Sequence, residues 1–272
     1  MKAIELAQPT AQVRHGGLWF WVVAFAFTTT MAFTTVPAPL WPLFAERDSL
    51  SSFMVTVVFA VYALAVALSL FLAGHLSDWY GRRRVLMPAI ALEVLAGVVF
   101  VVLPSLPGLL LARALSGLGI GAVTATATAW LTELRGARDR HTQIVATSAN
   151  LGGLGLGALI SGVLAQFASP PLRVPFVVFT VALCIAWVAL LGATETRRAE
   201  TPRPRYRAQR ISVPRASRGR FFAAALGAAI AFAVFGLLAS LASTVLEGTF
   251  HQPSHALAGS VTFAVFGAAA IT

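Results

Sequence analysis

Residues 74–84 read GHLSDWYGRRR and join two long apolar stretches, 53–73 and 85–103. They contain two glycines, one acidic residue and three consecutive arginines. A short turn between helices needs glycines for its tight geometry, and an acidic side chain at a helix end can bind an arginine or a neighbouring helix N-terminus. Arginines beside an apolar stretch hold that end of it on the cytoplasmic side of a membrane. The pattern predicts a charged cytoplasmic turn between two membrane-spanning helices.

The composition of the whole chain is that of a membrane protein. Of the 272 residues, 58% are hydrophobic and 11% are charged, whereas a soluble domain has roughly 45–50% apolar and about 25% charged residues. The net charge of +10 would favour nucleic-acid binding only if the basic residues lay on a soluble surface. Cys184 is the single cysteine, which excludes an internal disulfide framework.

The apolar stretches are long enough to span a bilayer, which takes about 20 mostly apolar residues in a helix. Stretches of this kind cover 18–44, 53–73, 85–103, 107–132, 144–168, 174–193 and 221–245. Another begins near Ala256 and is still apolar at Thr272. The first is too long for a signal peptide, and prolines interrupt its outer end. We therefore expect an all-α membrane protein with about eight transmembrane helices, truncated from twelve.

The basic residues are distributed unevenly among the connections. Of the 20 Lys and Arg residues, all but Arg47, Arg113 and Arg173 lie in the N-terminal tail and the even-numbered connections. Because Lys and Arg accumulate on the cytoplasmic side, we expect a cytoplasmic N-terminus and a multi-pass protein of the plasma (inner) membrane. The sixth connection, 194–220, is rich in Arg and Pro and indicates a mobile linker. A patch that binds anionic lipid or nucleic acid is the alternative, and we expect no nucleic-acid partner.

A weak internal repeat indicates two halves. Residues 57–65 read VVFAVYALA and residues 261–269 read VTFAVFGAA, with five identities in nine positions. Repeats of the same orientation, six crossings apart, are the parallel two-half design of many secondary transporters, and the spacing projects a whole protein of about 400 residues. The expected domains are a tail, a six-helix bundle, the linker and the first two helices of a second bundle, with bounds 1–17, 18–193, 194–220 and 221–272.

Residues 74–84 resemble the signature loop of the major facilitator superfamily, which has Gly, any residue, Leu, a small residue, Asp, two variable positions, Gly and a basic pair. The matching positions are Gly74, Leu76, Ser77, Asp78, Gly81, Arg82 and Arg83. The resemblance implies alternating access, in which two halves rock about a site at the middle of the membrane. It also implies that Asp78 and the Arg pair latch the halves shut on the cytoplasmic side, with partners beyond Thr272.

Arg113 lies inside the stretch 107–132, in RALSGLG. This segment resembles the family's Arg-x-x-Gln-Gly-x-Gly, with Ser116 where Gln is usual. An arginine in hydrocarbon costs at least a few kcal/mol and should face protein or a wet cavity. We expect a substrate or proton-coupling role for Arg113, and snorkelling to the outer surface is the alternative.

Small residues at intervals of four predict close helix packing. These are Gly117 and Gly121 in one stretch, and Gly153, Gly157 and Ser161 in another. The second set resembles an antiporter signature, but Ala158 replaces its Pro and Ser161 replaces one of its Gly residues. Pro37-Ala38-Pro39 resembles a Pro-x-Pro element of twelve-helix drug exporters. Together these features slightly favour export.

Glu93 is the only carboxylate well inside a predicted helix. Burial favours the neutral form of a carboxyl group, so Glu93 is a candidate proton carrier. A peripheral Glu bonded to a neighbour is the alternative. The threonines of the first stretch can bond their own helix backbone, and those on an inner face could line a substrate path. These threonines are Thr28, Thr29, Thr30, Thr34 and Thr35.

We therefore expect a secondary active transporter of small molecules, with protons as the coupling ion and no cofactor or metal. Proton-coupled uptake of a sugar or organic acid, and a non-transporting fragment, are the alternatives. A retinal protein needs a lysine in the membrane, and Lys2 is the only lysine. An intramembrane enzyme would need a base or metal ligand there, and no His lies in an expected crossing. An enzyme is not expected.

Overall fold

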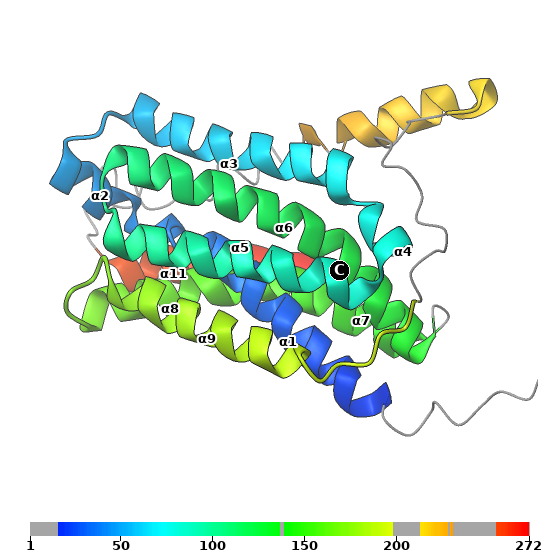
Figure 1. The fold of residues 1–272 in the computed structure, drawn as a ribbon. Coiled ribbons are helices and arrows are strands. Elements are labelled where there is room, and N and C mark those ends of the chain that lie inside the picture. The colour runs from blue at the N-terminus through cyan, green and yellow to red at the C-terminus, as the bar shows by residue number, and fades with distance from the viewer. Residues whose placement is uncertain (1–15, 137–138, 198–212, 228, 231–253, 272) are drawn as a thin grey trace, which may run out of the picture.

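The computed structural model describes residues 16–136, 139–197, 213–227, 229–230 and 254–271. All regular structure in these residues is helical, and the helices between residues 16 and 190 form one bundle with α11 (His255–Ile271), whereas the helical segment within 213–230 projects from it (Figure 1). Among the described residues, five helical spans are long and apolar enough to cross a membrane, and two shorter apolar helices accompany them. The expected all-α membrane bundle is thereby confirmed.

The first predicted crossing, 18–44, is a helix broken in its second half. It consists of α1 (Gly16–Thr35), a 3₁₀ turn (Ala38–Leu40) and α2 (Trp41–Asp48). The break falls at Pro37, because proline disfavours the helical conformation of the residue before it and has no N–H to donate. α1 runs through the middle of the bundle, in contact with α6, α8 and α9.

Three long helices form one side of the bundle: α3 (Ser52–Ala73), α5 (Arg82–Val102) and α6 (Leu106–Arg135). α6 packs against both α3 and α5. Gly117 and Gly121 of α6 face α3. A Cβ on Gly117 would lie 2.6 Å from the carbonyl oxygen of Tyr62, and a Cβ on Gly121 would lie 2.8 Å from that of Val66. Glycine at these positions lets the two backbones approach closely.

The fifth predicted crossing, 144–168, contains α7 (Arg140–Thr147), a π turn (Ser148–Gly152) and α8 (Gly153–Phe167). α8 presents Gly153, Gly157 and Ser161 to α1. A Cβ on Gly157 would overlap the carbonyl oxygen of Ala32, and the Ser161 hydroxyl donates a hydrogen bond to the carbonyl oxygen of Val36 at 2.6 Å. α9 (Val174–Leu190) then packs against α1 and α5.

The last described helix, α11 (His255–Ile271), packs on α8 and lies behind α5 in Figure 1. A Cβ on Gly259 would overlap the carbonyl oxygen of Ala158, so these helices also approach closely. Of the predicted crossing 221–245, residues 221–227 and 229–230 are helical, and the remainder lies outside the described residues. Most of the expected linker and of the N-terminal tail also lies outside them.

Candidate functional site

The turn between α3 and α5 contains a helix of its own, α4 (Leu76–Tyr80). Gly74 continues the right-handed helical conformation at the end of α3, and Gly81 separates α4 from α5. Gly81 has φ +103°, and a Cβ there would lie 2.6 Å from a carboxylate oxygen of Glu195. Both the backbone conformation and the space therefore require glycine at this position.

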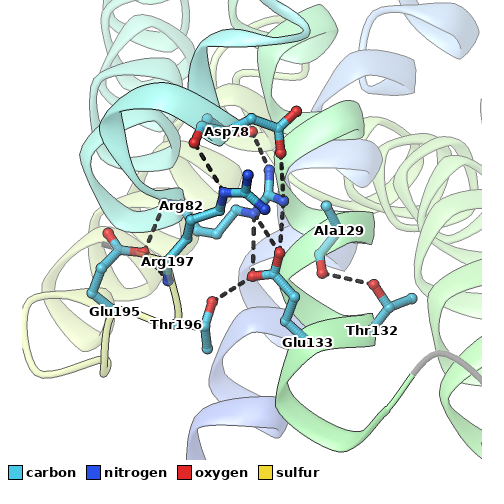
Figure 2. Close-up of polar contacts among 9 residues, drawn as sticks. Asp78, Arg82, Ala129, Thr132, Glu133, Glu195, Thr196 and Arg197 are labelled. Atoms are coloured by element: carbon cyan, nitrogen blue, oxygen red, sulfur yellow. Dashed lines mark hydrogen bonds and ion pairs between the residues drawn. The ribbon is translucent and has the colours of Figure 1, made fainter. Parts of the chain in front are cut away.

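Arg82, the first residue of α5, is 5% exposed and is surrounded by acceptors (Figure 2). Its guanidinium donates to a carboxylate oxygen of Asp78 at 2.8 Å and to one of Glu133 at 2.7 Å. It also donates to the Ser77 hydroxyl at 2.6 Å. A buried guanidinium needs such charged partners, because an unpaired charge away from water is costly.

Glu195 follows α9 and binds the N-terminus of α5. Its carboxylate accepts hydrogen bonds from the backbone N–H groups of Arg82, at 2.7 Å, and Arg83, at 3.0 Å. These N–H groups have no partner within the helix, and a negative charge is favourable at a helix N-terminus. Glu195 therefore fixes the segment after α9 to the start of α5.

The two residues after Glu195 extend the same network (Figure 2). The Thr196 hydroxyl donates to Glu133 at 2.6 Å, and Arg197 Nε donates to the carbonyl oxygen of Asp78 at 2.9 Å. We call this set of residues the basic-end network, and the end of the bundle that carries it the basic end. Its members are Ser77, Asp78, Arg82, Glu133, Glu195, Thr196 and Arg197.

The sequence pattern singled out Asp78 and Arg82 but not their partners Glu133 and Glu195. Both carboxylates lie at or just beyond the end of a predicted crossing, on the side that carries the arginine clusters. Their position beside the arginine clusters is the sequence feature that could have identified them as partners of Arg82. In the structure Asp78 and Arg82 pair within the first bundle, and a latch between two halves stays a prediction.

Arg113 is buried in α6, with 2% of its surface exposed. It donates a hydrogen bond to the carbonyl oxygen of Thr34 at 2.9 Å, near the end of α1, where helix carbonyls lack partners of their own. Its guanidinium carbon lies 5.0–5.4 Å from the ring centroids of Tyr62, Phe59 and Trp41. The charge therefore lies among aromatic faces, which attract cations, and does not extend to the outer surface.

Glu93 is completely buried in α5 and faces α6. A Cβ on Gly119 of α6 would lie 2.7 Å from one Glu93 carboxylate oxygen. Among the described residues, neither oxygen accepts a hydrogen bond of normal geometry and no ion pair joins Glu93 to Arg113. The buried Ser116 hydroxyl, which also lacks a partner there, interacts with Glu93 electrostatically. The Ile120 backbone interacts with Glu93 as well. The carboxyl is thus enclosed by protein and has polar neighbours, but no ion pair among the described residues.

The threonine hydroxyls of α1 bond mostly to their own helix. Thr28, Thr30 and Thr34 donate to carbonyl oxygens three or four residues earlier. Thr35 also donates to the carbonyl oxygen of Leu154 in α8, at 2.6 Å. These hydroxyls therefore satisfy backbone groups and connect α1 to α8.

Residues 20–272 match the family model described as Major Facilitator Superfamily. The chain belongs to the major facilitator superfamily. The match covers the broken first crossing, the basic-end network and α11, so the resemblance found in residues 74–84 extends over the whole bundle.

Curated relatives match parts of this chain. The inner membrane transport protein YnfM of Escherichia coli K12 is 28% identical over 174 residues, which are 60% of this chain and 40% of YnfM. The bacillibactin exporter of Bacillus subtilis 168 is 33% identical over 61 residues, which are 22% of this chain and 15% of the exporter. The chain therefore matches less than half the length of either relative.

Two solved structures share the fold. A bacterial homologue of the human lysosomal transporter Spinster, in an inward-facing and unoccupied conformation, has a TM-score of 0.71 at 18% identity, covering 95% of this chain and 61% of that one. The human organic anion transporter MFSD10 has a TM-score of 0.66 at 17% identity, covering 97% of this chain and 71% of that one. The family and these neighbours are membrane transporters, not enzymes.

Proposed function

We propose that this chain supplies the first bundle, and part of the second, of a proton-coupled transporter that exports small molecules by alternating access. Membership of the major facilitator superfamily supports transport, and a relative named as an exporter favours that direction. The proposal for proton coupling depends on one observation: Glu93 is fully buried and has no ion pair among the described residues.

The surroundings of Glu93 suit a group that changes its charge during transport. A carboxyl in a water-poor site favours the neutral form, and any movement that lets in water or brings a cation closer favours the charged form. Arg113 lies in the facing helix and is such a cation. Binding and release of a proton at Glu93 can therefore favour different arrangements of α5 and α6.

The basic-end network is suited to act as a gate in the same cycle. It connects α4, α5, the end of α6 and the segment after α9 through charged hydrogen bonds. The Asp78 side chain keeps 45% of its surface exposed, so it has room for a further partner. We propose that this partner belongs to the second half, and that the basic end is cytoplasmic.

Glu93→Gln in the protein expressed from its full reading frame tests the coupling. The measurement is pH-gradient-driven flux in inverted membrane vesicles, with ethidium as the probe for export and radiolabelled lactate or a sugar as probes for uptake. We expect gradient-driven ethidium movement in the wild type and its loss in Glu93→Gln. Glu46→Gln, at an exposed position of α2, is the matched control and should keep the flux.

The other outcomes separate the alternatives. Gradient-driven flux that survives in Glu93→Gln rejects Glu93 as the proton carrier. Gradient-driven flux of lactate or sugar, with none of ethidium, favours uptake over export. If the 272-residue chain moves no probe and the longer reading frame does, the result favours the alternative of a non-transporting fragment.

A further inference from the structure

A groove of about 590 Å³ opens between α3 and α5, with α6 as its floor. Its walls are mostly apolar, with Leu72, Leu92 and Leu118 contributed by the three helices. The Ser69 hydroxyl in the groove already donates to the carbonyl oxygen of Leu118 at 2.6 Å. The long part of the groove therefore suits a hydrocarbon chain better than a polar solute.

One end of the groove is polar and basic. Tyr80, the last residue of α4, and Arg84, in the first turn of α5, line it there. The Arg84 side chain is exposed, and none of the hydrogen bonds or ion pairs among the described residues involves it. Pro88, one turn further along α5, lines the same groove and has no N–H for the Arg84 carbonyl. The end of the groove is thus lined by a cationic and an aromatic side chain.

α11 does not line the groove. It packs on α8, on the far side of α5 (Figure 1). Exposed apolar side chains border the groove, such as Leu68 of α3 and Leu95 of α5, which are 49% and 48% exposed. Exposed apolar side chains of this kind suit contact with lipid chains, which can then reach the groove from the side.

We propose that the groove binds one anionic glycerophospholipid, with an acyl chain between α3 and α5 and the phosphate on Arg84. The volume accommodates a chain-sized ligand, the apolar walls can pack against an acyl chain, and basic pockets between transmembrane helices bind anionic headgroups. The guanidinium at the polar end selects for negative charge. The bound lipid spans α3, α4 and α5, beside the basic-end network.

The test is native mass spectrometry of the 272-residue chain, delipidated and then mixed with phosphatidylglycerol or phosphatidylcholine of identical acyl chains. The wild type should retain one phosphatidylglycerol in preference to phosphatidylcholine. Arg84→Gln should lower that preference about fivefold, which corresponds to about 1 kcal/mol for one basic residue at an anionic lipid. Arg140→Gln, at an exposed arginine on α7 that does not line the groove, is the matched control and should leave the preference unchanged.

A second pair of variants tests whether the acyl chain of the lipid lies in the groove. Ala73→Trp fills the groove and should lower retention of both lipids, whereas Ala63→Trp, on the exposed face of α3 outside the groove, should not. Circular dichroism verifies that each variant is folded. If Arg84→Gln and Arg140→Gln lower the preference for phosphatidylglycerol equally, the overall positive charge, and not Arg84, selects the lipid. Unchanged retention in folded Ala73→Trp would place the lipid outside the groove. Either result overturns the proposal, and so does equal retention of the two lipids by the wild type.

Discussion

Arg82 and Arg84 are two positions apart and have opposite surroundings. Arg82 is buried and binds two carboxylates, whereas Arg84 is exposed at the edge of the groove. Successive residues of a helix point about 100° apart, so neighbours in one basic run face different partners. The three arginines of residues 82–84 therefore do not form a single functional unit.

Gly81 and Gly136 allow the cost of backbone strain to be separated from the cost of a steric overlap. Both have positive φ, +103° and +104°, but only Gly81 lies against other atoms, those of Glu195 and Arg197. Alanine at either position should cost on the order of 1–3 kcal/mol, because this backbone region is nearly restricted to glycine. Gly81→Ala should cost about 1 kcal/mol more, since it displaces Glu195 from the N-terminus of α5.

Thermal unfolding in detergent, followed by circular dichroism, measures both effects. The melting temperature of Gly81→Ala should lie below that of Gly136→Ala. Equal melting temperatures would show that the contact between Glu195 and α5 contributes little to stability.

At the scale of elements, α8 has two faces made of small residues. Gly153, Gly157 and Ser161 face α1, while Gly155 and Gly162 face α11. Within a bilayer the hydrophobic effect does not drive helices together, so close packing and hydrogen bonds have to hold them. α8 therefore packs closely against both α1 and α11.

Gly157→Ala should destabilise the contact between α1 and α8. The added methyl would overlap the carbonyl oxygen of Ala32, and overpacking of this kind typically costs about 1–3 kcal/mol. The matched control is Gly152→Ala, because a Cβ at Gly152 meets no atom within 4 Å. The fraction unfolded during a titration with a denaturing detergent measures the difference. A Gly157→Ala protein as stable as Gly152→Ala would contradict the packing described for α1 and α8.

At the scale of the whole molecule, the charge pattern predicts which end lies in the cytoplasm. The α6–α7 connection at Gly136 lies at the basic end, and the α8–α9 connection near Ser169 lies at the opposite end. Because basic residues accumulate on the cytoplasmic side, alkaline phosphatase fused after Gly136 should be inactive and a fusion after Ser169 should be active. The enzyme needs an oxidising compartment for its disulfides, so its activity reports the side directly. The reverse pattern of activities would invert the proposed orientation.

Much of the fold follows from the sequence because the bilayer imposes one requirement on every crossing. Backbone groups in hydrocarbon must be bonded internally, so an apolar stretch of about 20 residues is a helix. The predicted stretches 53–73, 85–103 and 107–132 agree with α3, α5 and α6 to within three residues at each end. The glycines and charges of residues 74–84 likewise predicted the family, since they are local features of the chain.

The partners of the charged residues were decided only by the tertiary structure. Arg82 meets Glu133, which is 51 residues away, and its N–H meets Glu195, which is 113 residues away. The aromatic surroundings of Arg113, the enclosure of Glu93 beside Gly119 and the groove at Arg84 also depend on how α3, α5 and α6 pack. Hydrophobic length determines that a helix crosses the membrane, but in lipid all apolar faces are nearly equivalent. Only close packing of small residues and specific polar bonds select which faces meet.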